Sequence, residues 1–397
     1  MLLGLVLAAC AAGAPQGVRP GIDVLLDDSL ALVQGQRVGL LTNRAGVDAR
    51  GVDDVTRLRE AGVRLTALFS PEHGFRAQLD EENIGHGVDS ATGLPIYSLY
   101  GAIRAPTPSM LATIDVLLVD LQDIGGRPYT YVTTALEALK AAHAAGVPLI
   151  VLDRPNPIGG AVQGPVLDTA FRSDIGMLPI PMRHGMTLGE LVRLGNDLLG
   201  IRGRLTVVPV AGWSRDAWFD ATALPWIPPS PSMPSLESAT HYPGIVLFEA
   251  TNLSVGRGTP IAFQVVGAPW LDPEAVRRAL GSVPGVALAD TVIVPVAPPD
   301  GKYANTTVPA IRLRVTDRDT YDPVATAVRL LGAIRARHAD SLTIVAARFD
   351  KLAGTDRVRR ELWAGRDPAA LAVGWDAALA GFAERRRRYS LYRSELP

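Results

Sequence analysis

Short apolar runs alternate with helical segments over the first half of the chain, and this rhythm restricts the fold more than any other feature. The expected strands cover residues 37–41, 64–69, 115–119, 148–152 and 205–210, and the expected helices cover 53–61, 133–145 and 187–199. This alternation is typical of βαβ units that build a parallel sheet. Continuous apolar runs such as 115–119 (DVLLV) suit strands that are covered on both faces. We therefore predict an α/β fold with a doubly wound parallel sheet.

Prolines gather where this pattern stops, with six of them between residues 225 and 243. Such a density disfavours regular structure and favours an extended, rigid connection. Beyond it, strand-like runs lie at 245–248, 261–266 and 310–315, and helical stretches lie near 273–280, 323–337 and 368–384. We predict a first domain at 21–240 and a second, smaller α/β or α+β domain at 241–397 that completes a cleft.

The N-terminus is an apolar run that ends at the only cysteine, Cys10. Residues 1–10 (MLLGLVLAAC) have about the length of a signal-peptide core and end in small residues. The segment LAAC is similar to a lipobox, in which the cysteine is lipidated after cleavage, although no Lys or Arg precedes it. An ordinary secretory signal is the alternative. We predict residues 1–20 as signal and tether, and an exported protein: a periplasmic or cell-envelope lipoprotein, otherwise secreted. Membrane contact is expected only through Cys10.

Charge and motifs exclude several other classes of protein. The chain carries 39 basic and 40 acidic residues, so no overall field attracts nucleic acid. The basic run 385–388 (RRRR) is interpreted as the solvated end of a last helix. The six histidines are scattered without ligand spacing, and residues 40–46 (LLTNRAG) lack a dinucleotide fingerprint. Neither a metal site nor a cofactor is predicted.

Polar residues follow four of the expected strands, in the loops 42–44 (TNR), 70–76 (SPEHGFR), 120–131 (DLQDIGGRPYTY) and 153–157 (DRPNP). Ligands of open parallel sheets bind outside the carboxyl ends of the strands. Carboxylates, amides, guanidinium groups and aromatic rings at one edge suit a polyhydroxylated ligand such as a sugar. Taken singly, several of these residues could equally cap helices or anchor strands. Glu72 differs, because it lies in a loop between a proline and a histidine and so is not a surface charge on a helix.

These loops resemble those of the NamZ family of bacterial exo-beta-N-acetylmuramidases, long called DUF1343. The resemblance rests on loops 70–76 and 120–131 and continues through 152–157 (LDRPNP), 182–187 (MRHGMT), 229–234 (PSPSMP) and 249–259 (EATNLSVGRGT). It implies a Rossmann-like catalytic domain joined to a smaller C-terminal domain. It also implies an exo-acting glycosidase that releases N-acetylmuramic acid from the non-reducing end of peptidoglycan fragments during cell-wall turnover and recycling.

Glycosidic cleavage needs a proton donor and a second group that attacks or stabilises the oxocarbenium-like centre. We predict Glu72 as the acid, with His73 beside it as an orienting residue. Asp123 is ranked first for the second role, ahead of Asp120, Glu249 and a tyrosine, and a substrate acetamido group is an alternative. The candidates for binding the substrate's lactyl carboxylate are Arg127, Arg183 and Arg257. Asp120 and Glu249 are also predicted to bind substrate. The other predicted substrate-binding residues are Asn43, Arg76, Gln122, Tyr129, Tyr131, Asp153, Asn156, His184 and Asn252.

A protein of another class would show many of the same features. An exported sugar- or muropeptide-binding protein would also have two α/β domains and a polar rim, and it would bind peptidoglycan-derived saccharides without turnover. Release of a monosaccharide from the end of a chain distinguishes the two.

Overall fold

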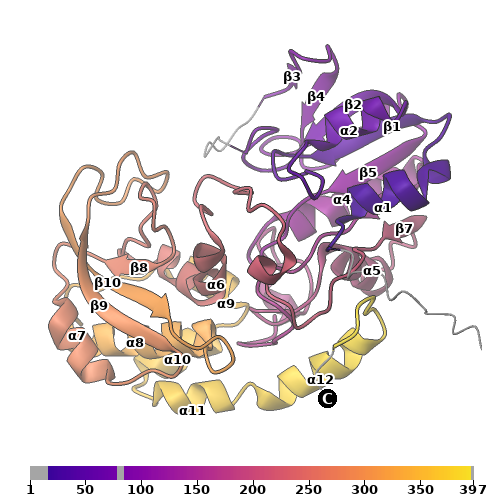
Figure 1. The fold of residues 1–397 in the computed structure, drawn as a ribbon. Helices are drawn as coiled ribbons and strands as arrows, with labels where there is room; N and C mark the ends of the chain where they lie inside the picture. Colours follow the sequence, from indigo (N-terminus) through magenta and orange to yellow (C-terminus); the bar gives the residue numbers. More distant parts are fainter. Residues whose placement is uncertain (1–16, 78–84, 395–397) are drawn as a thin grey trace, which may run out of the picture.

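A computed structural model describes residues 17–77 and 85–394, so Cys10 and the predicted signal lie outside the described residues. The N-terminal domain is built on a seven-stranded sheet with the order β3-β4-β2-β1-β5-β6-β7 (Figure 1). Its strands are β1 (Arg37–Thr42), β2 (Arg64–Ser70), β3 (Gly87–Val88), β4 (Pro95–Ser98), β5 (Val116–Asp120), β6 (Leu149–Leu152) and β7 (Leu205–Val208). Only the pairing of β3 with β4 is antiparallel.

Helices cover both faces of this sheet, which confirms the predicted doubly wound fold. On one face, α1 (Gly21–Asp28) and α2 (Asp54–Glu60) bury Leu25 and Leu58 against strand residues such as Leu40. On the other face, α4 (Tyr131–Ala144) and α5 (Leu188–Leu198) join the larger core. Because both faces are covered, every residue of β5 is buried, as its apolar run predicts.

The C-terminal domain carries a three-stranded antiparallel sheet in the order β8-β10-β9, so it is an α+β unit. Its strands are β8 (Val265–Gly267), β9 (Val286–Ile293) and β10 (Val308–Val315). Helices α7 (Pro273–Leu280) and α8 (Pro323–Arg337) have the predicted bounds, because each starts with an aspartate cap followed by proline. Together these elements confirm a smaller second domain beside the parallel sheet.

Four predictions for the second half are wrong in part. Residues 225–235 are irregular as predicted, but α6 (Leu236–Ile245) follows and includes Pro243. Residues 245–248 end α6 and enter the 3-10 helix η4 (Val246–Ala250), because a short buried apolar run does not distinguish strand from helix. The predicted strand at 261–266 is reduced to β8, and the predicted helix at 368–384 is two helices, α11 (Pro368–Val373) and α12 (Asp376–Arg387).

Several elements were not predicted: α1, β3, β4, α3 (Pro108–Leu111), α9 (Ala346–Ala353), α10 (Arg357–Trp363) and strand β9. They are short, lie at edges or, in the case of β9, expose half of their residues. Their sequences therefore lack long apolar periodicity, which is the main local signal of a helix or strand.

The C-terminal segment returns to the first domain, as Figure 1 shows for the region after α12. The Tyr392 hydroxyl donates to Asp153 at 2.6 Å, and Arg386 donates to the Gly160 carbonyl at 2.6 Å. The interpretation of 385–388 as a solvated helix end holds for Arg385, Arg387 and Arg388, whereas Arg386 is half-buried in this interdomain contact.

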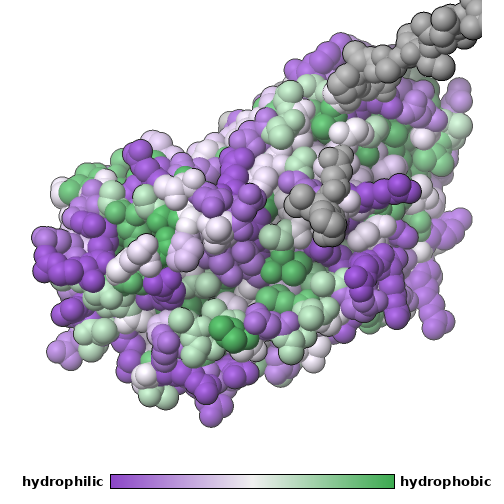
Figure 2. Space-filling view, turned by 60° about the horizontal axis from the view of Figure 1, so that its bottom comes forward, coloured by the Kyte–Doolittle hydropathy of each residue, from purple (hydrophilic) through white to green (hydrophobic). Residues whose placement is uncertain are grey.

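The described surface gives no sign of a membrane span. Hydrophilic and hydrophobic residues are interspersed on the face seen in Figure 2. Within residues 17–77 and 85–394, no helix is both long and apolar enough to cross a bilayer.

Candidate active site

A cleft of about 810 Å³ lies where the loops after β2 and β5 meet the C-terminal domain. From the first domain it is lined by Glu72, His73, Tyr100, Pro128, Tyr129, Thr130, Asp174 and Ile175. From the proline-rich segment and beyond it is lined by Ser230, Ser232, Met233, Tyr242, Val246, Glu249, Arg257, Phe263, Pro299, Asp300, Lys302, Val345, Ala347, Arg348, Lys351 and Leu352. Both domains therefore contribute to a single cavity of the size that suits a small saccharide.

Glu72 lies half-buried on the wall of this cleft. Its carboxylate accepts a hydrogen bond of 2.5 Å from the Thr130 hydroxyl. Thr130 is the N-cap of α4 but makes no side-chain cap, so its hydroxyl is used on Glu72 instead. The Tyr100 hydroxyl lies beside the same carboxylate, and burial, followed by the charge of Glu72, raises the pKa of Tyr100. Glu72 makes no ion pair with any residue in the described ranges.

The turn at 123–127 places the residues that follow β5 at the cleft. Gly125 has a φ of +82°, and a Cβ there would meet Ile158 at 2.6 Å, so only glycine fits. The Asp123 carboxylate accepts the Gly125 N–H at 2.7 Å, and the Arg127 N–H donates to the Met182 carbonyl at 2.8 Å. The chain then delivers Tyr129 to the cleft wall.

Aromatic rings form one side of the cleft. Tyr129 packs edge-on against Tyr131 and Tyr242, with ring centroids 4.7 and 5.9 Å apart, and Tyr242 packs in the same way on Phe263. Tyr129, Tyr242 and Phe263 line the cavity. Such faces suit the apolar side of a sugar ring.

The C-terminal wall carries an ion pair. Arg257 donates to Glu249 at 2.6 Å, and its guanidinium lies 5.1 Å from the centre of the Phe263 ring. Lys302 is largely buried, which lowers its pKa, and its ammonium donates to the carbonyl oxygens of Glu249 and Leu253.

His73 and Arg76 border a second, smaller groove of about 280 Å³ next to the cleft. His73 lines both cavities and adopts a φ of +71°, an unusual conformation for a residue with a side chain. Arg76 is exposed and lines only the smaller groove.

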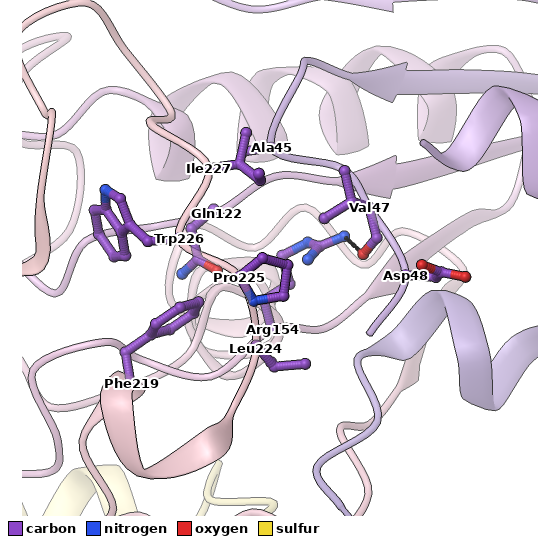
Figure 3. A pocket seen from close by; sticks show the side chains of 10 residues that line it. All are labelled: Ala45, Val47, Asp48, Gln122, Arg154, Phe219, Leu224, Pro225, Trp226 and Ile227. Atoms are coloured by element: carbon purple, nitrogen blue, oxygen red, sulfur yellow. Dashed lines mark hydrogen bonds between the residues drawn. The ribbon is translucent and has the colours of Figure 1, made fainter. Parts of the chain in front are cut away.

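Asp120 and Gln122, both predicted at the site, are instead turned inward. Asp120 is fully buried and forms an ion pair with Arg154. Gln122 donates to the carbonyl oxygens of Asp123 and Pro155 and borders a pocket of only about 10 Å³ (Figure 3). In that pocket Arg154 donates to the Val47 carbonyl. Space for about one water molecule cannot hold a sugar.

The polar residues of the loop after β6 also make hydrogen bonds within the protein. Asp153 accepts hydrogen bonds from Thr187, Gly189 and Tyr392, and burial raises its pKa to about 6. Asn156 donates to the Met186 carbonyl at 2.9 Å. The loop thus joins the N-terminus of α5 to the C-terminal segment and does not border the cleft.

Asp123 and His184 lie together behind the wall. His184 Nε2 is 3.4 Å from an Asp123 carboxylate oxygen, and both side chains are almost completely buried. Asp123 is not among the residues that line the cleft. The residue ranked first for the second catalytic role therefore supports the turn, through Gly125, and does not face the cavity.

Two of the three predicted carboxylate-binding arginines are buried away from the cavity. Arg127 donates to the carbonyl oxygens of Pro165, Ile180 and Leu352, and burial lowers its pKa to about 9. Arg183 donates to Gln163 at 2.9 Å and stacks on Trp218. Their donors are used inside the protein, which leaves Arg257 as the predicted arginine on the wall.

The remaining predicted amides and Tyr131 have structural partners. Asn43 donates to the Tyr131 hydroxyl and to the Pro229 carbonyl, and Tyr131 also donates to Pro229. Asn252 bridges the Ser341 carbonyl and the Thr343 N–H. These bonds hold the proline-rich segment and the loop before α9 in place.

The structure also adds cleft residues that the sequence analysis did not select: Tyr100, Thr130, Asp174, Ser230, Ser232, Lys302, Arg348 and Lys351. Thr130 lies in the motif 120–131, and Ser230 and Ser232 lie in the motif 229–234. These motifs could therefore have indicated the three residues. Arg348 and Lys351 lie on a helix that no pattern predicted, and nothing in their local sequence distinguishes them from surface charges.

Within residues 17–77 and 85–394, no group of three or more His, Cys, Asp or Glu side chains is arranged to hold a metal ion.

Comparison with known proteins covers almost the whole chain. The models of the N-terminal and C-terminal domains of exo-beta-N-acetylmuramidase NamZ match residues 38–237 and 240–392. A peptidoglycan beta-N-acetylmuramidase NamZ from Bacillus subtilis (strain 168) is 39% identical over 406 residues, which cover 99% of this chain and 97% of that relative.

Solved structures agree with the fold. Crystal structures of two DUF1343 family proteins from Bacteroides fragilis NCTC 9343 superpose with TM-scores of 0.86 and 0.76 at 32% and 30% identity. They cover 95% and 96% of this chain, and 99% and 100% of their own chains are matched. The chain therefore belongs to the exo-beta-N-acetylmuramidase NamZ family, and it is a glycosidase of that family.

Proposed function

We propose that this glycosidase releases N-acetylmuramic acid from the non-reducing end of peptidoglycan fragments in the interdomain cleft, with Glu72 as the general acid. The observation that carries the proposal is the position of Glu72. Among the described carboxylates that line the cleft, it alone makes no ion pair, since Asp174, Glu249 and Asp300 each have a basic partner. A carboxyl group without an ion-pair partner, next to a sugar-sized cavity, is what leaving-group protonation requires.

Two hydroxyls fix this carboxyl group. The Thr130 hydroxyl donates to one oxygen at 2.5 Å, and Tyr100 lies beside the carboxylate as well. Fixed orientation matters because a general acid must lie within hydrogen-bonding distance of the atom that it protonates.

For the second role, we propose the acetamido group of the substrate. Glu249 is on the wall, but its charge is neutralised by Arg257 at 2.6 Å. Asp123 lies behind the wall and accepts the Gly125 N–H. An attacking acetamido oxygen removes the need for a second free carboxylate, and the protein then only has to orient it.

The cellular place of this reaction is a further part of the proposal. The apolar start of the sequence and its Leu-Ala-Ala-Cys segment support export, with Cys10 as the lipid-carrying residue. Labelling cells with a fatty-acid analogue and comparing wild type with Cys10→Ala tests this directly, because a lipoprotein loses the label in the variant.

The catalytic proposal is tested by release of free N-acetylmuramic acid from a MurNAc-GlcNAc disaccharide or a chromogenic MurNAc glycoside. Glu72→Gln keeps the shape of the side chain and removes the acid, so kcat should fall about 10²- to 10⁴-fold. Asp174→Asn is the matched control, since it also lines the cleft but is paired with Arg104, and it should retain most activity.

The same assay separates the alternatives. Tight binding without turnover in the wild type would favour the sugar-binding protein. Turnover that survives Glu72→Gln would move the acid elsewhere. A loss in Glu249→Gln as large as that in Glu72→Gln would make Glu249 the second catalytic group and contradict the acetamido proposal.

A further inference from the structure

The basic residues that line the cleft all belong to its C-terminal wall. They are Arg257, Lys302, Arg348 and Lys351. The facing wall of the first domain contributes Glu72 and Asp174 to the same cavity. The cations that line the cleft are therefore confined to one wall, although that wall also carries the acids Glu249 and Asp300.

Two of these cations are neutralised within the wall. Arg257 forms its 2.6 Å ion pair with Glu249. Lys302 donates to two carbonyl oxygens, and its ammonium lies 3.7 Å from Asp300. These interactions use donors that a ligand would otherwise need, so both residues chiefly shape the wall.

The other two cations, Arg348 and Lys351, keep their donors available. The nearest acid to Arg348 is Glu249, at 3.8 Å, and that carboxylate is already bound by Arg257. The Arg348 side chain is 58% exposed, and Lys351 is exposed and has no ion pair with any residue of the described ranges. Both residues lie three positions apart on α9, so they are neighbours on one face of the helix.

The position of α9 brings this pair to the cavity. Val345 and Ala347, at the start of the helix, also line the cleft, and Val345 provides no side-chain cap for the first turn. At the opposite end, the Leu352 carbonyl accepts a hydrogen bond from Arg127 of the first domain at 2.9 Å. A buried guanidinium therefore holds α9 in place from behind, where a cation also complements the helix dipole.

Tyr129 provides an independent indication that a polar ligand belongs here. It is only 6% exposed and lines the cleft, and its hydroxyl makes no hydrogen bond of normal geometry among the described residues, although Ser230 and Tyr131 lie near it. A buried hydroxyl with poorly aligned partners loses hydrogen-bond free energy, which a bound ligand would recover.

We propose that Arg348 and Lys351 bind the lactyl carboxylate of the terminal sugar and thereby select muramic acid over N-acetylglucosamine. The inference rests on the proposed function, because it assumes that this sugar enters the cleft. The lactyl carboxylate is the one charged group that distinguishes the two N-acetylated sugars. Arginine can bind it through two N–H groups, and lysine adds a second charge.

The first test is binding, which does not depend on turnover. Isothermal titration calorimetry with free N-acetylmuramic acid and with N-acetylglucosamine is carried out on wild type and on Arg348→Gln/Lys351→Gln. The double variant should bind N-acetylmuramic acid about 10- to 100-fold more weakly, because it loses charged hydrogen bonds. Its binding of N-acetylglucosamine should be unchanged.

The matched control is Arg360→Gln/Arg366→Gln, which removes the same number of charges from exposed residues outside the cleft. It should bind both sugars like the wild type, which excludes an effect of net charge. Arg348→Lys should keep only part of the preference, because the charge is retained but the two-pronged contact is lost.

Kinetics provide the second readout. In the double variant, KM for a chromogenic MurNAc glycoside should rise while kcat stays within about threefold, as expected for a contact present in both ground and transition states. An equal loss for both sugars, or no change in their ratio, would overturn the inference. Wild-type turnover without a preference for the carboxylate would overturn it while sparing the proposed function. Preference for the carboxylate without turnover would overturn the proposed function and leave the inference about Arg348 and Lys351 standing.

Discussion

The two domains use the charged side chains near the cleft in different ways. In the first domain, charged residues at the ends of β5 and β6 bind other residues of the protein, as in the ion pair Asp120–Arg154 and the hydrogen bond from Tyr392 to Asp153. On the C-terminal domain, Arg348 and Lys351 extend from α9 into the cavity. The first domain thus supplies a rigid platform that carries Glu72, and the second supplies the two cations that remain available to a ligand.

Distance from the strand end explains the difference. Asp120 is the last residue of β5 and is fully buried, whereas Tyr129 and Thr130, further along the same loop, line the cleft. The rule that ligands bind beyond the carboxyl ends of parallel strands therefore locates the region. It does not identify the residues, because those closest to the strands must hold the loops together.

If this contrast is right, the largest loss of stability should follow from breaking the buried network. Arg154→Met leaves Asp120 and Asp54 buried without their cation and should reduce the free energy of unfolding by about 3–5 kcal/mol. Urea unfolding measures this. Arg278→Met, which breaks an exposed pair with Glu274, should cost at most about 1 kcal/mol. Equal effects of the two changes would show that the buried network is not what stabilises the platform.

A second prediction uses pH. Burial raises the pKa of Asp153 to about 6 from an ordinary value of 3.8. The native state therefore keeps a proton that the unfolded state releases, and stability falls as pH rises from about 4 to about 6. The shift corresponds to a loss of about 3 kcal/mol, complete above the folded pKa.

Unfolding experiments at both ends of this range check the sign. The stability of wild type relative to Asp153→Asn should decrease by about that amount as pH rises, since the asparagine cannot ionise. The exposed change Asp319→Asn should show no such trend. A relative stability that increases with pH would mean that the hydrogen bonds from Thr187, Gly189 and Tyr392 outweigh burial.

Much of the fold could be predicted from the sequence because its elements have strong local signals. The apolar run of β5 and the Asp-Pro starts of α7 and α8 each determine an element with few alternatives. Residues 245–248 failed because a buried apolar run without a period fits a strand and a helix equally well. Pro243 failed as a helix breaker because α6 is almost entirely buried, and packing outweighs intrinsic propensity.

The site was less predictable, for a physical reason. Arg127, Arg183 and Arg257 look alike in the sequence, each within a polar motif. Which guanidinium reaches the cavity depends on which backbone carbonyl oxygens lie near the other two, and those come from distant segments such as Leu352. No local pattern contains that information.

Replacing these arginines by lysine gives the smallest and most specific contrast between the walls. Arg183→Lys keeps the charge but loses one of the bonds to Gln163 or Ile158 and the stacking on Trp218, so it should cost about 1–3 kcal/mol of stability. It should leave KM unchanged.

Arg257→Lys should instead change KM and leave stability almost unchanged. Lysine preserves the charge beside Glu249 but loses the geometry of the 2.6 Å bond on the cleft wall, so KM should rise about two- to fivefold, with unfolding almost unaffected. Denaturant unfolding and initial rates on one substrate measure both quantities for each variant. An effect of Arg183→Lys on KM without a loss of stability would place that residue in the site after all. The division of labour between the walls would then be wrong, since a buried arginine of the platform would be acting on substrate.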